Sequence, residues 1–380
     1  LELSEALKSI GTNLGTSSSF DRCSITLNTL RKHLTKSMEL FSDVLLNPTF
    51  PQEELERKKK EYLARILQER RQPFLNAIKA VFRLIYGEDH PYGQPYTGTG
   101  TEESIAAIQR SDLVRYYKEY FHPNNATLVV VGDIERDELA DRLQASLDDW
   151  ERADVPPVAI PEPPMLNESR VYLIHKPNAA QSVIVAGRPG LQRNSPDYYS
   201  AVVANTVLGG KFTSRLNSNL REDKGYTYGA RSMFMFFKGL GPFALYTQVQ
   251  TEVTRESLVE IVRELRALSG DRPVSPEELA GTQQYLTLRY PREFETVSQV
   301  AAKLGELVMF NLPADTFNRY MPSIRSTTVQ SVTSAAEKYL RSDQMYYVIV
   351  GDLDKIEVGI SELNLGKIRY LDLAGQPVKR

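Results

Sequence analysis

The chain contains the same structural unit twice, and this repeat restricts its architecture more than any other feature. Residues 120–133 read YFHPNNATLVVVGD and residues 339–352 read YLRSDQMYYVIVGD, so an aromatic helix end, an apolar strand and a Gly-Asp pair recur at an offset of 219 residues. Residues 11–18 likewise correspond to residues 225–232, at an offset of 214. Internal similarity of this kind is the signature of a duplicated supersecondary unit. We therefore predict two related modules.

The repeat also predicts the module boundaries. The second module starts near Arg170, so an offset of 214 places the start of the first about 44 residues before Leu1. We therefore expect the first module, residues 1–153, to be N-terminally incomplete. Residues 154–166 contain five prolines, which is typical of a semi-rigid linker. The second module then covers residues 167–380.

Composition excludes several classes of protein. The net charge is −2 and the basic residues are scattered, so nucleic acid is not an expected partner. No apolar stretch approaches the ~18 residues that a membrane span requires. The single cysteine, Cys23, cannot form an internal disulfide, and its alternating apolar setting predicts a buried core thiol. A signal peptide would precede Leu1, which leaves the compartment open.

Helical segments placed between strands of alternating polarity predict an α+β fold with helices over one face of each sheet and the other face free. In the first module we expect helices ending near Gly11 and at 34–46, 52–69, 78–85 and 102–120, with strands at 22–30 and 126–131. In the second we expect strands at 170–175 and 182–188, a hairpin of 228–237 with 243–249, and helices at 196–208, 214–223, 256–268 and 276–290.

One block makes the chain recognisable. Residues 208–216 read LGGKFTSRL and residues 220–228 read LREDKGYTY. The block resembles the C-terminal half of the pitrilysin/insulinase-like zinc peptidases, the inverzincins, whose pattern is approximately LGG-x-x-x-SRL…LRE-x-x-G-x-x-Y. The LLNPTF at 45–50, the HPYG at 90–93 and both strand-Gly-Asp units also fit, so the resemblance covers essentially the whole chain. It implies the pitrilysin-like fold, in which each module is a mostly antiparallel mixed sheet covered by helices.

The resemblance implies a site at Arg221 and Tyr228. In this family H-x-x-E-H and a downstream Glu hold zinc on one half, and an Arg/Tyr pair comes from the facing half. Guanidinium and phenol groups are donors that can hold substrate carbonyl oxygens and stabilise the developing oxyanion. The alternative interpretation is structural: Arg221 would pair with Glu222 or Asp223, and Tyr228 would be a core aromatic of a strand.

The chain departs from the family pattern at the metal ligands. In catalytic members the helix after the Asn-Pro turn resembles ER-x-x-V-x-x-E, whose last Glu is the ligand. When this chain is placed in that register, Arg65 lies at the position of the ligand Glu and Lys58 lies at a supporting acidic position. Two cations would repel zinc, so we predict no metal site in this chain. A register shifted by four residues, which would use Glu61 or Glu69, is the alternative. No H-x-x-E-H occurs in residues 1–380, and its equivalent would precede Leu1.

The histidines show no chelating pattern. None of the four forms an i, i+3 or i, i+4 pair, so we interpret all of them as structural or exposed. They are His33, His90, His122 and His175.

The resemblance favours a non-catalytic half of a zinc peptidase, without a cofactor of its own. Its expected partners are peptide substrates and a zinc-bearing subunit or fused half, in a heterodimer or, alternatively, a homodimer. In this family the zinc half holds substrates by β-augmentation at an edge strand. Two other hypotheses stay open: an active peptidase with H-x-x-E-H upstream, and a scaffold resembling the core subunits of respiratory complexes. Similarity to bacterial two-subunit members favours a bacterial periplasmic protein, with the cytoplasm as the alternative.

Overall fold

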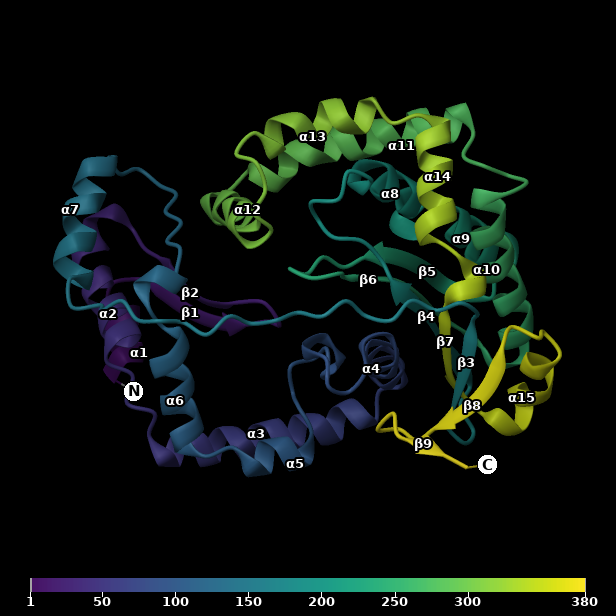
Figure 1. Ribbon diagram of the computed structural model, residues 1–380, viewed down its shortest axis with the longest axis horizontal. Helices are drawn as coiled ribbons and strands as arrows, with labels where there is room; N and C mark the ends of the chain where they lie inside the picture. Colours follow the sequence, from purple (N-terminus) through teal and green to yellow (C-terminus); the bar gives the residue numbers. More distant parts are fainter. Residues whose placement is uncertain (1, 380) are drawn as a thin grey trace. The chain divides into compact units, whose positions relative to one another are not determined.

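A computed structural model describes residues 2–379, and the chain forms two compact units, each of which is described by itself (Figure 1). Unit 1 comprises residues up to Leu63, Glu102–Ala159 and Phe294–Met309, and unit 2 comprises Ala64–Thr101, Ile160–Glu293 and residues from Phe310 onward. Residues 64–101 of the first repeat therefore fold with the second sheet. The boundaries 1–153, 154–166 and 167–380 concern the duplication itself and stay a prediction. Residues 154–166 contain neither helix nor strand.

Unit 1 is mainly helical and contains one antiparallel hairpin. In the hairpin, β1 (Asn13–Ser18) pairs with β2 (Cys23–Asn28), and the helix α2 (Leu34–Leu46) packs against α7 (Arg136–Leu147). The remaining helices are α1 (Glu2–Ser9), the first part of α3 (Gln52–Arg70), α5 (Glu102–Ala107), α6 (Arg110–Tyr120) and α12 (Val297–Met309).

Unit 2 is built on a seven-stranded sheet of order β5-β6-β4-β7-β3-β8-β9. Only the β7–β3 and β3–β8 pairs are parallel, so the sheet is mixed and mostly antiparallel. The strands are β3 (Arg170–His175), β4 (Gln181–Pro189), β5 (Thr227–Phe234), β6 (Pro242–Gln250), β7 (Tyr346–Gly351), β8 (Lys367–Leu371) and β9 (Pro377–Val378). The helices are α4 (Pro73–Tyr86), α8 (Tyr198–Asn205), α9 (Arg215–Asn217), α10 (Thr254–Ser269), α11 (Pro276–Arg289), α13 (Thr316–Arg325), α14 (Val329–Tyr339) and α15 (Leu353–Ser361).

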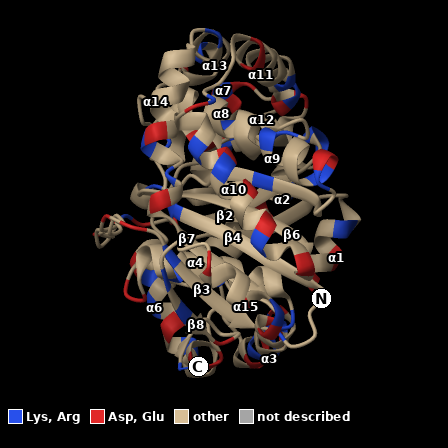
Figure 2. Cartoon of the chain, turned by 90° about the vertical axis from the view of Figure 1, so that its right-hand side faces the viewer, with Lys and Arg blue, Asp and Glu red and all other residues tan. Residues whose placement is uncertain are grey.

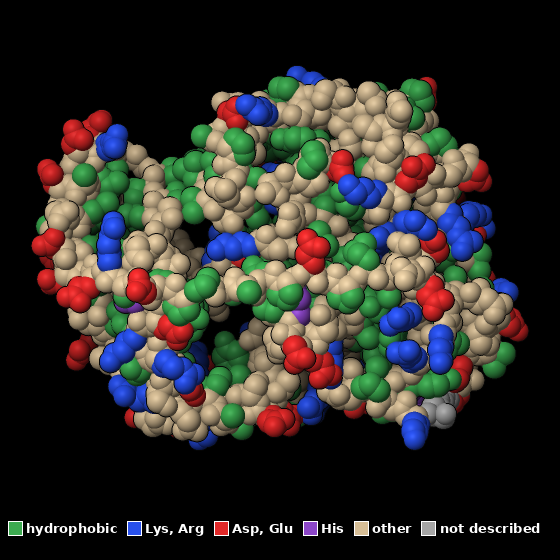
Figure 3. Space-filling view, in the orientation of Figure 1, with side chains coloured by type: hydrophobic (Ala, Val, Ile, Leu, Met, Phe, Trp, Pro, Cys, Tyr) green, Lys and Arg blue, Asp and Glu red, His purple; other side chains and the backbone are tan. Residues whose placement is uncertain are grey.

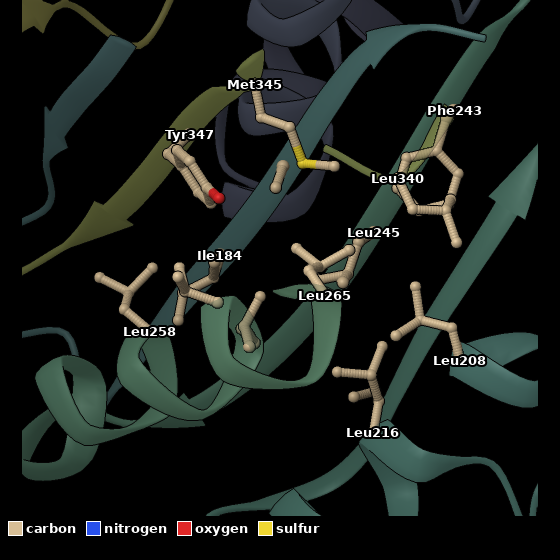
Figure 4. Close-up of a cluster of buried hydrophobic side chains, with 14 of the residues drawn as sticks. Ile184, Leu208, Leu216, Phe243, Leu245, Leu258, Leu265, Leu340, Met345 and Tyr347 are labelled. Carbon is tan, nitrogen blue, oxygen red and sulfur yellow. The ribbon is translucent and has the colours of Figure 1, made fainter. Parts of the chain in front are cut away.

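The main core lies between one face of this sheet and helices that include α10 and α14. Figure 4 shows Leu258 and Leu265 of α10 facing Ile184 and Leu245 of the sheet, and all four side chains are fully buried. Burying one such side chain stabilises the fold by roughly 1.5–3 kcal/mol. The predicted α+β fold with a helix-covered mixed sheet is confirmed.

The second face of the sheet is not free, contrary to the expectation from strand polarity. The helix α4 lies on β4 and β7, and its buried face includes Val81 and Ile85. Gly187 of β4 admits this helix, because a Cβ there would lie 2.6 Å from a methyl carbon of Val81. The two central strands are therefore apolar on both faces, which a strand covered on one face would not be.

Two expected elements of the first module differ in the structure. Residues 126–131 form no strand, and Leu128 and Val130 are exposed. In the second repeat the corresponding strand, β7, pairs with β3 and β4, and residues 126–131 have no such neighbouring strands among residues 2–379. The predicted helix 102–120 is broken at Gln109, whose backbone N–H donates to the Asp112 carboxylate 2.8 Å away and starts a new helix.

The prediction of a buried Cys23 is wrong. Cys23 is exposed at the last residue pair of the β1–β2 hairpin, opposite Ser18. Its Sγ lies 3.4 Å from the hydroxyl of Tyr116. A two-stranded ribbon has no neighbouring strand to cover its end, so the polarity pattern of β2 does not bury this thiol.

Charges of both signs are interspersed over the helices in the view of Figure 2. This distribution agrees with the net charge of −2. Among residues 2–379, every helix is too short or too polar to cross a bilayer.

Candidate functional site

The block that carries the family resemblance forms a compact corner of unit 2. The π-helical turn η4 (Thr206–Gly210), helix α9 and the π-helical turn η5 (Ser218–Asp223) all pack against β5. Gly209 permits this close approach, since a Cβ there would lie 2.6 Å from the backbone nitrogen of Ser232. The first glycine of the Leu-Gly-Gly sequence is therefore required for packing against β5.

Arg215 anchors the corner. Its guanidinium forms two hydrogen bonds with the Glu278 carboxylate, at 2.8 and 2.6 Å, and donates to the carbonyl of Arg272 at 2.6 Å. The side chain is almost fully buried. Burial raises the pKa of Glu278, but the hydrogen bonds from Arg215 and from the Ser275 N–H, together with the charges of Arg215 and Arg272, lower it overall. Arg215 was not among the predicted site residues, although it belongs to the SRL of the block.

A glycine turn leads from this corner into β5. The backbone N–H of Tyr226 donates to the carbonyl of Leu220 at 2.8 Å, and that of Gly225 donates to the carbonyl of Arg221 at 3.2 Å. Gly225 has φ +67°, in the left-handed region that glycine adopts at low cost. The turn brings the chain from the helix that carries Arg221 to the strand that carries Tyr228.

Tyr228 is held out of the sheet by a β-bulge. The pairing of β5 with β6 shifts between Thr227 and Ala230, so the ladder is irregular at Tyr228 and Gly229. The Thr227 hydroxyl fixes the bulge by donating to the carbonyl of Gln248 at 2.6 Å. Tyr228 is 91% exposed. The alternative interpretation of Tyr228 as a core aromatic is therefore wrong, and bulges commonly re-aim a side chain in this way.

Arg221 lies over an exposed aromatic ring. Its guanidinium carbon is 4.4 Å from the ring centroid of Phe212, which is 63% exposed. Its Nε is 3.5 Å from a carboxylate oxygen of Glu222, a weak contact that leaves the guanidinium about one third exposed. The expected pairing with Glu222 thus exists, but it does not occupy the other donors of the guanidinium.

Together these side chains give the corner two accessible hydrogen-bond donors of different kinds, with Tyr228 exposed and Arg221 partly exposed. Arg221 supplies a fixed positive charge and Tyr228 a neutral hydroxyl, and neither has a buried role that would explain it. Both belong to unit 2, and β5 is an edge strand of its sheet (Figure 1). Such groups can bind carbonyl oxygens or an oxyanion, but alone they supply neither a nucleophile nor a base.

The helix α3 carries Arg65 and Lys58, the two cations that the predicted register places at acidic positions of the family pattern. Arg65 is 58% exposed, and its Nε lies 3.3 Å from a carboxylate oxygen of Glu69. Lys58 donates to the Glu61 carboxylate at 2.9 Å. Both side chains take part in ion pairs along the helix surface.

The two carboxylates of the shifted register are occupied by protein partners. Glu61 is exposed and pairs with Arg57 and Lys58. Glu69 is buried and accepts hydrogen bonds from Thr99 at 2.8 Å, from Thr97 at 3.1 Å and from Lys79. Burial would raise the pKa of Glu69, yet the bonds from Lys79 and Thr99 lower it. A carboxylate held this way is a structural group rather than an open metal ligand.

The histidines mostly accept or donate local bonds. A ring nitrogen of His90 accepts from the Tyr92 N–H at 2.9 Å, and a ring nitrogen of His122 lies 2.7 Å from the carbonyl of Lys118. His33 is half-buried beside α2. These positions fit the structural interpretation.

The ring of His175 lies with Asp352 and Asp354 in the one group of three possible metal ligands found among residues 2–379. One ligand atom from each lies within 4.8 Å of the others. However, Nδ1 of His175 accepts from the Leu353 N–H at 3.2 Å, and Asp352 accepts from the Asn178 N–H at 3.2 Å. Through these hydrogen bonds His175 and Asp352 stabilise the backbone at the ends of β3 and β7, which is a structural role.

Comparisons with known proteins agree with this geometry. Residues 1–89 match the description "Insulinase (Peptidase family M16)" and residues 107–286 match "Peptidase M16 inactive domain". The chain belongs to the M16 peptidase family, so the resemblance to pitrilysin/insulinase-like peptidases is confirmed. Residues 107–286 include the corner with Arg221 and Tyr228, whereas Arg65 lies in the insulinase match.

Individual relatives carry contrasting names. The chain is 22% identical to the "Uncharacterized zinc protease YmxG" of Bacillus subtilis, over 90% of this chain and 81% of the relative. It is 24% identical to the "Non-peptidase homolog YmxG" of Helicobacter pylori, over 92% and 79%. The crystal structure of a peptidase M16 inactive domain from Pseudomonas fluorescens superposes with a TM-score of 0.85 at 24% identity, covering 92% of this chain and 82% of that one. This last likeness shows the fold.

Proposed function

We propose that this chain is a non-catalytic half of a zinc-dependent M16 peptidase. It would pair with a zinc-bearing half, enclose peptide substrates and supply Arg221 and Tyr228 to the reaction. The observation that carries the proposal is the exposure of Tyr228, which a bulge turns out of an edge strand in the same corner as Arg221. The match of residues 107–286 to the description "Peptidase M16 inactive domain" supports a non-catalytic role for the part of the chain that carries Arg221 and Tyr228.

The chemistry divides between the two halves. When bound to the partner, zinc would polarise the scissile carbonyl and supply the attacking water. In this chain, Arg221 would bind a substrate carbonyl through its open N–H groups, with Phe212 restricting the guanidinium plane. Tyr228 would donate its hydroxyl proton in a hydrogen bond to the developing oxyanion. Because α3 carries Arg65 at the ligand register, no zinc is expected here.

Substitution in the assembled complex tests the proposal. We expect Arg221→Ala and Tyr228→Phe each to lower kcat/KM for peptide cleavage by about 10²-fold, the usual effect of losing one oxyanion donor. Lys224→Ala removes an exposed cation from the same turn and should leave the rate unchanged within about twofold. Unchanged cleavage by both Arg221→Ala and Tyr228→Phe would refute the assignment.

The relatives' names keep two alternatives in view. The name of the Bacillus relative fits an active zinc peptidase, which would need H-x-x-E-H before Leu1. The name of the Helicobacter relative fits a protein without peptidase activity, such as a scaffold. A scaffold predicts that no substitution in the corner affects proteolysis, and an active peptidase predicts zinc in this chain.

A further inference from the structure

A hollow of about 260 Å³ lies in unit 2, away from the corner of Arg221 and Tyr228, and nothing in the proposed function uses it. Its lining comes from the end of α4, from β3, β7 and β8, and from the turn before β9. The polar lining residues are Arg83, Glu88, Arg170, Tyr172, Tyr346, Arg369 and Tyr370. Three arginines against one glutamate give the lining a net charge of +2, in a chain whose net charge is −2.

The strand register places four of these side chains on one face of the sheet. Arg170 and Tyr172 are two residues apart on β3 and therefore point to the same side. Arg170 pairs with Tyr346 of β7, and Tyr172 pairs with Arg369 of β8. Neighbours in register share a face, so two guanidinium groups and two phenols gather there. Figure 3 shows Lys and Arg side chains gathered at the lower right, where Figure 1 places β3 and β8.

Two of the three arginines have no counter-ion among residues 2–379. Arg83 contacts Glu88 and donates to the side-chain oxygen of Gln376 at 3.0 Å. Across residues 2–379, by contrast, the side chains of Arg170 and Arg369 form neither an ion pair nor a hydrogen bond. Two neighbouring cations without a counter-ion repel each other, and an anion bound between them would relieve that repulsion.

The tyrosines add donors that are also unused. Tyr172 and Tyr346 are each only 4% exposed, and neither hydroxyl has a hydrogen-bond partner in the described part of the chain. Burial raises the pKa of Tyr346, while the charges of Arg170 and Arg369 act to lower it, so both guanidinium groups lie near this ring. Neither hydroxyl oxygen is fully buried, so both can reach a ligand in the hollow that these tyrosines line.

We propose that this hollow binds the phosphate group of a small phosphate monoester, held by Arg170 and Arg369 and by the hydroxyls of Tyr172 and Tyr346. Guanidinium groups match phosphate oxygens in pairs. A phosphate monoester has three terminal oxygens and close to two negative charges at neutral pH, which suits four donors and a lining charge of +2. A carboxylate offers two oxygens and one charge, so it should bind more weakly.

Calorimetric titration of the purified full chain at pH 7.5 tests this site, with phenyl phosphate, inorganic phosphate and benzoate as probes. Both phosphates should bind, and benzoate should bind at least about tenfold more weakly. Arg170→Gln and Arg369→Gln should each weaken phenyl phosphate binding about tenfold or more. Arg231→Gln is the matched control, because Arg231 is an exposed arginine on β5 at the opposite edge of the sheet, and it should change affinity less than about twofold.

The variants distinguish a loss of phosphate binding at the site from a loss of binding caused by unfolding. Arg369 is exposed, so Arg369→Gln should keep the thermal midpoint of the wild type and decides the question even if Arg170→Gln unfolds. Absence of phosphate binding to the wild type, or equal affinity in Arg369→Gln, would overturn the site. Equal binding of benzoate and phenyl phosphate would overturn the choice of phosphate. None of these results depends on peptidase activity.

Discussion

At the scale of single residues, exposure decides which polar groups are available for function. Tyr228 is exposed because a bulge turns it outward, whereas Arg215, only six positions before Arg221, is buried and committed to Glu278. Glu69 is committed in the same way to Lys79 and two threonines. Functional and structural charges therefore lie close together in sequence and differ in their partners.

The Glu69 cluster predicts a specific loss of stability in acid. The pKa of Glu69 lies below its ordinary value of about 4.5, so its contribution to the free energy of unfolding is complete above that pH and is lost as the pH falls through the lowered pKa. We expect Glu69→Gln to lower the free energy of unfolding by about 2 kcal/mol at pH 7. The difference from wild type should shrink towards pH 3 in urea unfolding.

The matched control for this prediction is Glu54→Gln on the same helix. Glu54 is exposed and pairs with Arg57, so its loss should change stability little at either pH. A difference between wild type and Glu69→Gln that is the same at pH 7 and pH 3 would show that Glu69 contributes by packing and not by its charge.

At the scale of elements, the turn between η5 and β5 sets the path from Arg221 to Tyr228. Gly225 occupies the left-handed region, and a Cβ there would touch nothing within 4 Å, so any cost of a side chain comes from the backbone alone. The turn is stabilised by two backbone hydrogen bonds to Leu220 and Arg221. The element therefore depends on one glycine for its conformation.

Substituting Gly225 tests that dependence. Gly225→Ala should lower the free energy of unfolding by about 1–2 kcal/mol, the cost of a left-handed alanine. Gly281→Ala, in the exposed interior of α11 where a Cβ also meets nothing, should instead raise it by about 0.5–1 kcal/mol. Thermal or urea unfolding distinguishes the two signs, and equal effects of the two substitutions would contradict the role of the turn.

Elements that are determined by their own apolar periodicity could be predicted from the sequence. Features that depend on contacts with other elements could not. The helix Leu34–Leu46 and the strand Arg170–His175 have the predicted bounds, because apolar periodicity determines them. Residues 126–131 have a strand pattern but no neighbouring strand, and the exposure of Cys23 likewise depends on what covers the hairpin. The polarity pattern of a segment does not show which neighbouring elements will cover it.

The candidate site was predictable to a similar degree. The motif located Arg221 and Tyr228, and the structure adds the bulge and the Phe212 ring that set their surroundings. Arg215 was missed because its partner Glu278 lies 63 residues further along the chain. The hollow near Arg170 and Arg369 arises from strand pairing over about 200 residues, which sequence spacing does not reveal.

At the scale of the whole molecule, the chain combines an M16 fold with a predicted change at the metal ligands. Residues 107–286 match the description of an M16 inactive domain, and the predicted register places Arg65 of α3 where catalytic members carry the third ligand. The Arg221 and Tyr228 corner is nevertheless present and exposed. We infer that this chain contributes the hydrogen-bond donors of the active site and that the partner contributes the zinc ion.

The most direct test of this account is zinc content together with cleavage of a mixed peptide library, measured on the purified full-length gene product alone and after addition of a zinc-bearing M16 partner. We expect no stoichiometric zinc and no cleavage by the product alone, with cleavage appearing in the complex. One zinc ion per chain together with cleavage by the isolated product would contradict it, and would mean that this chain is itself the peptidase.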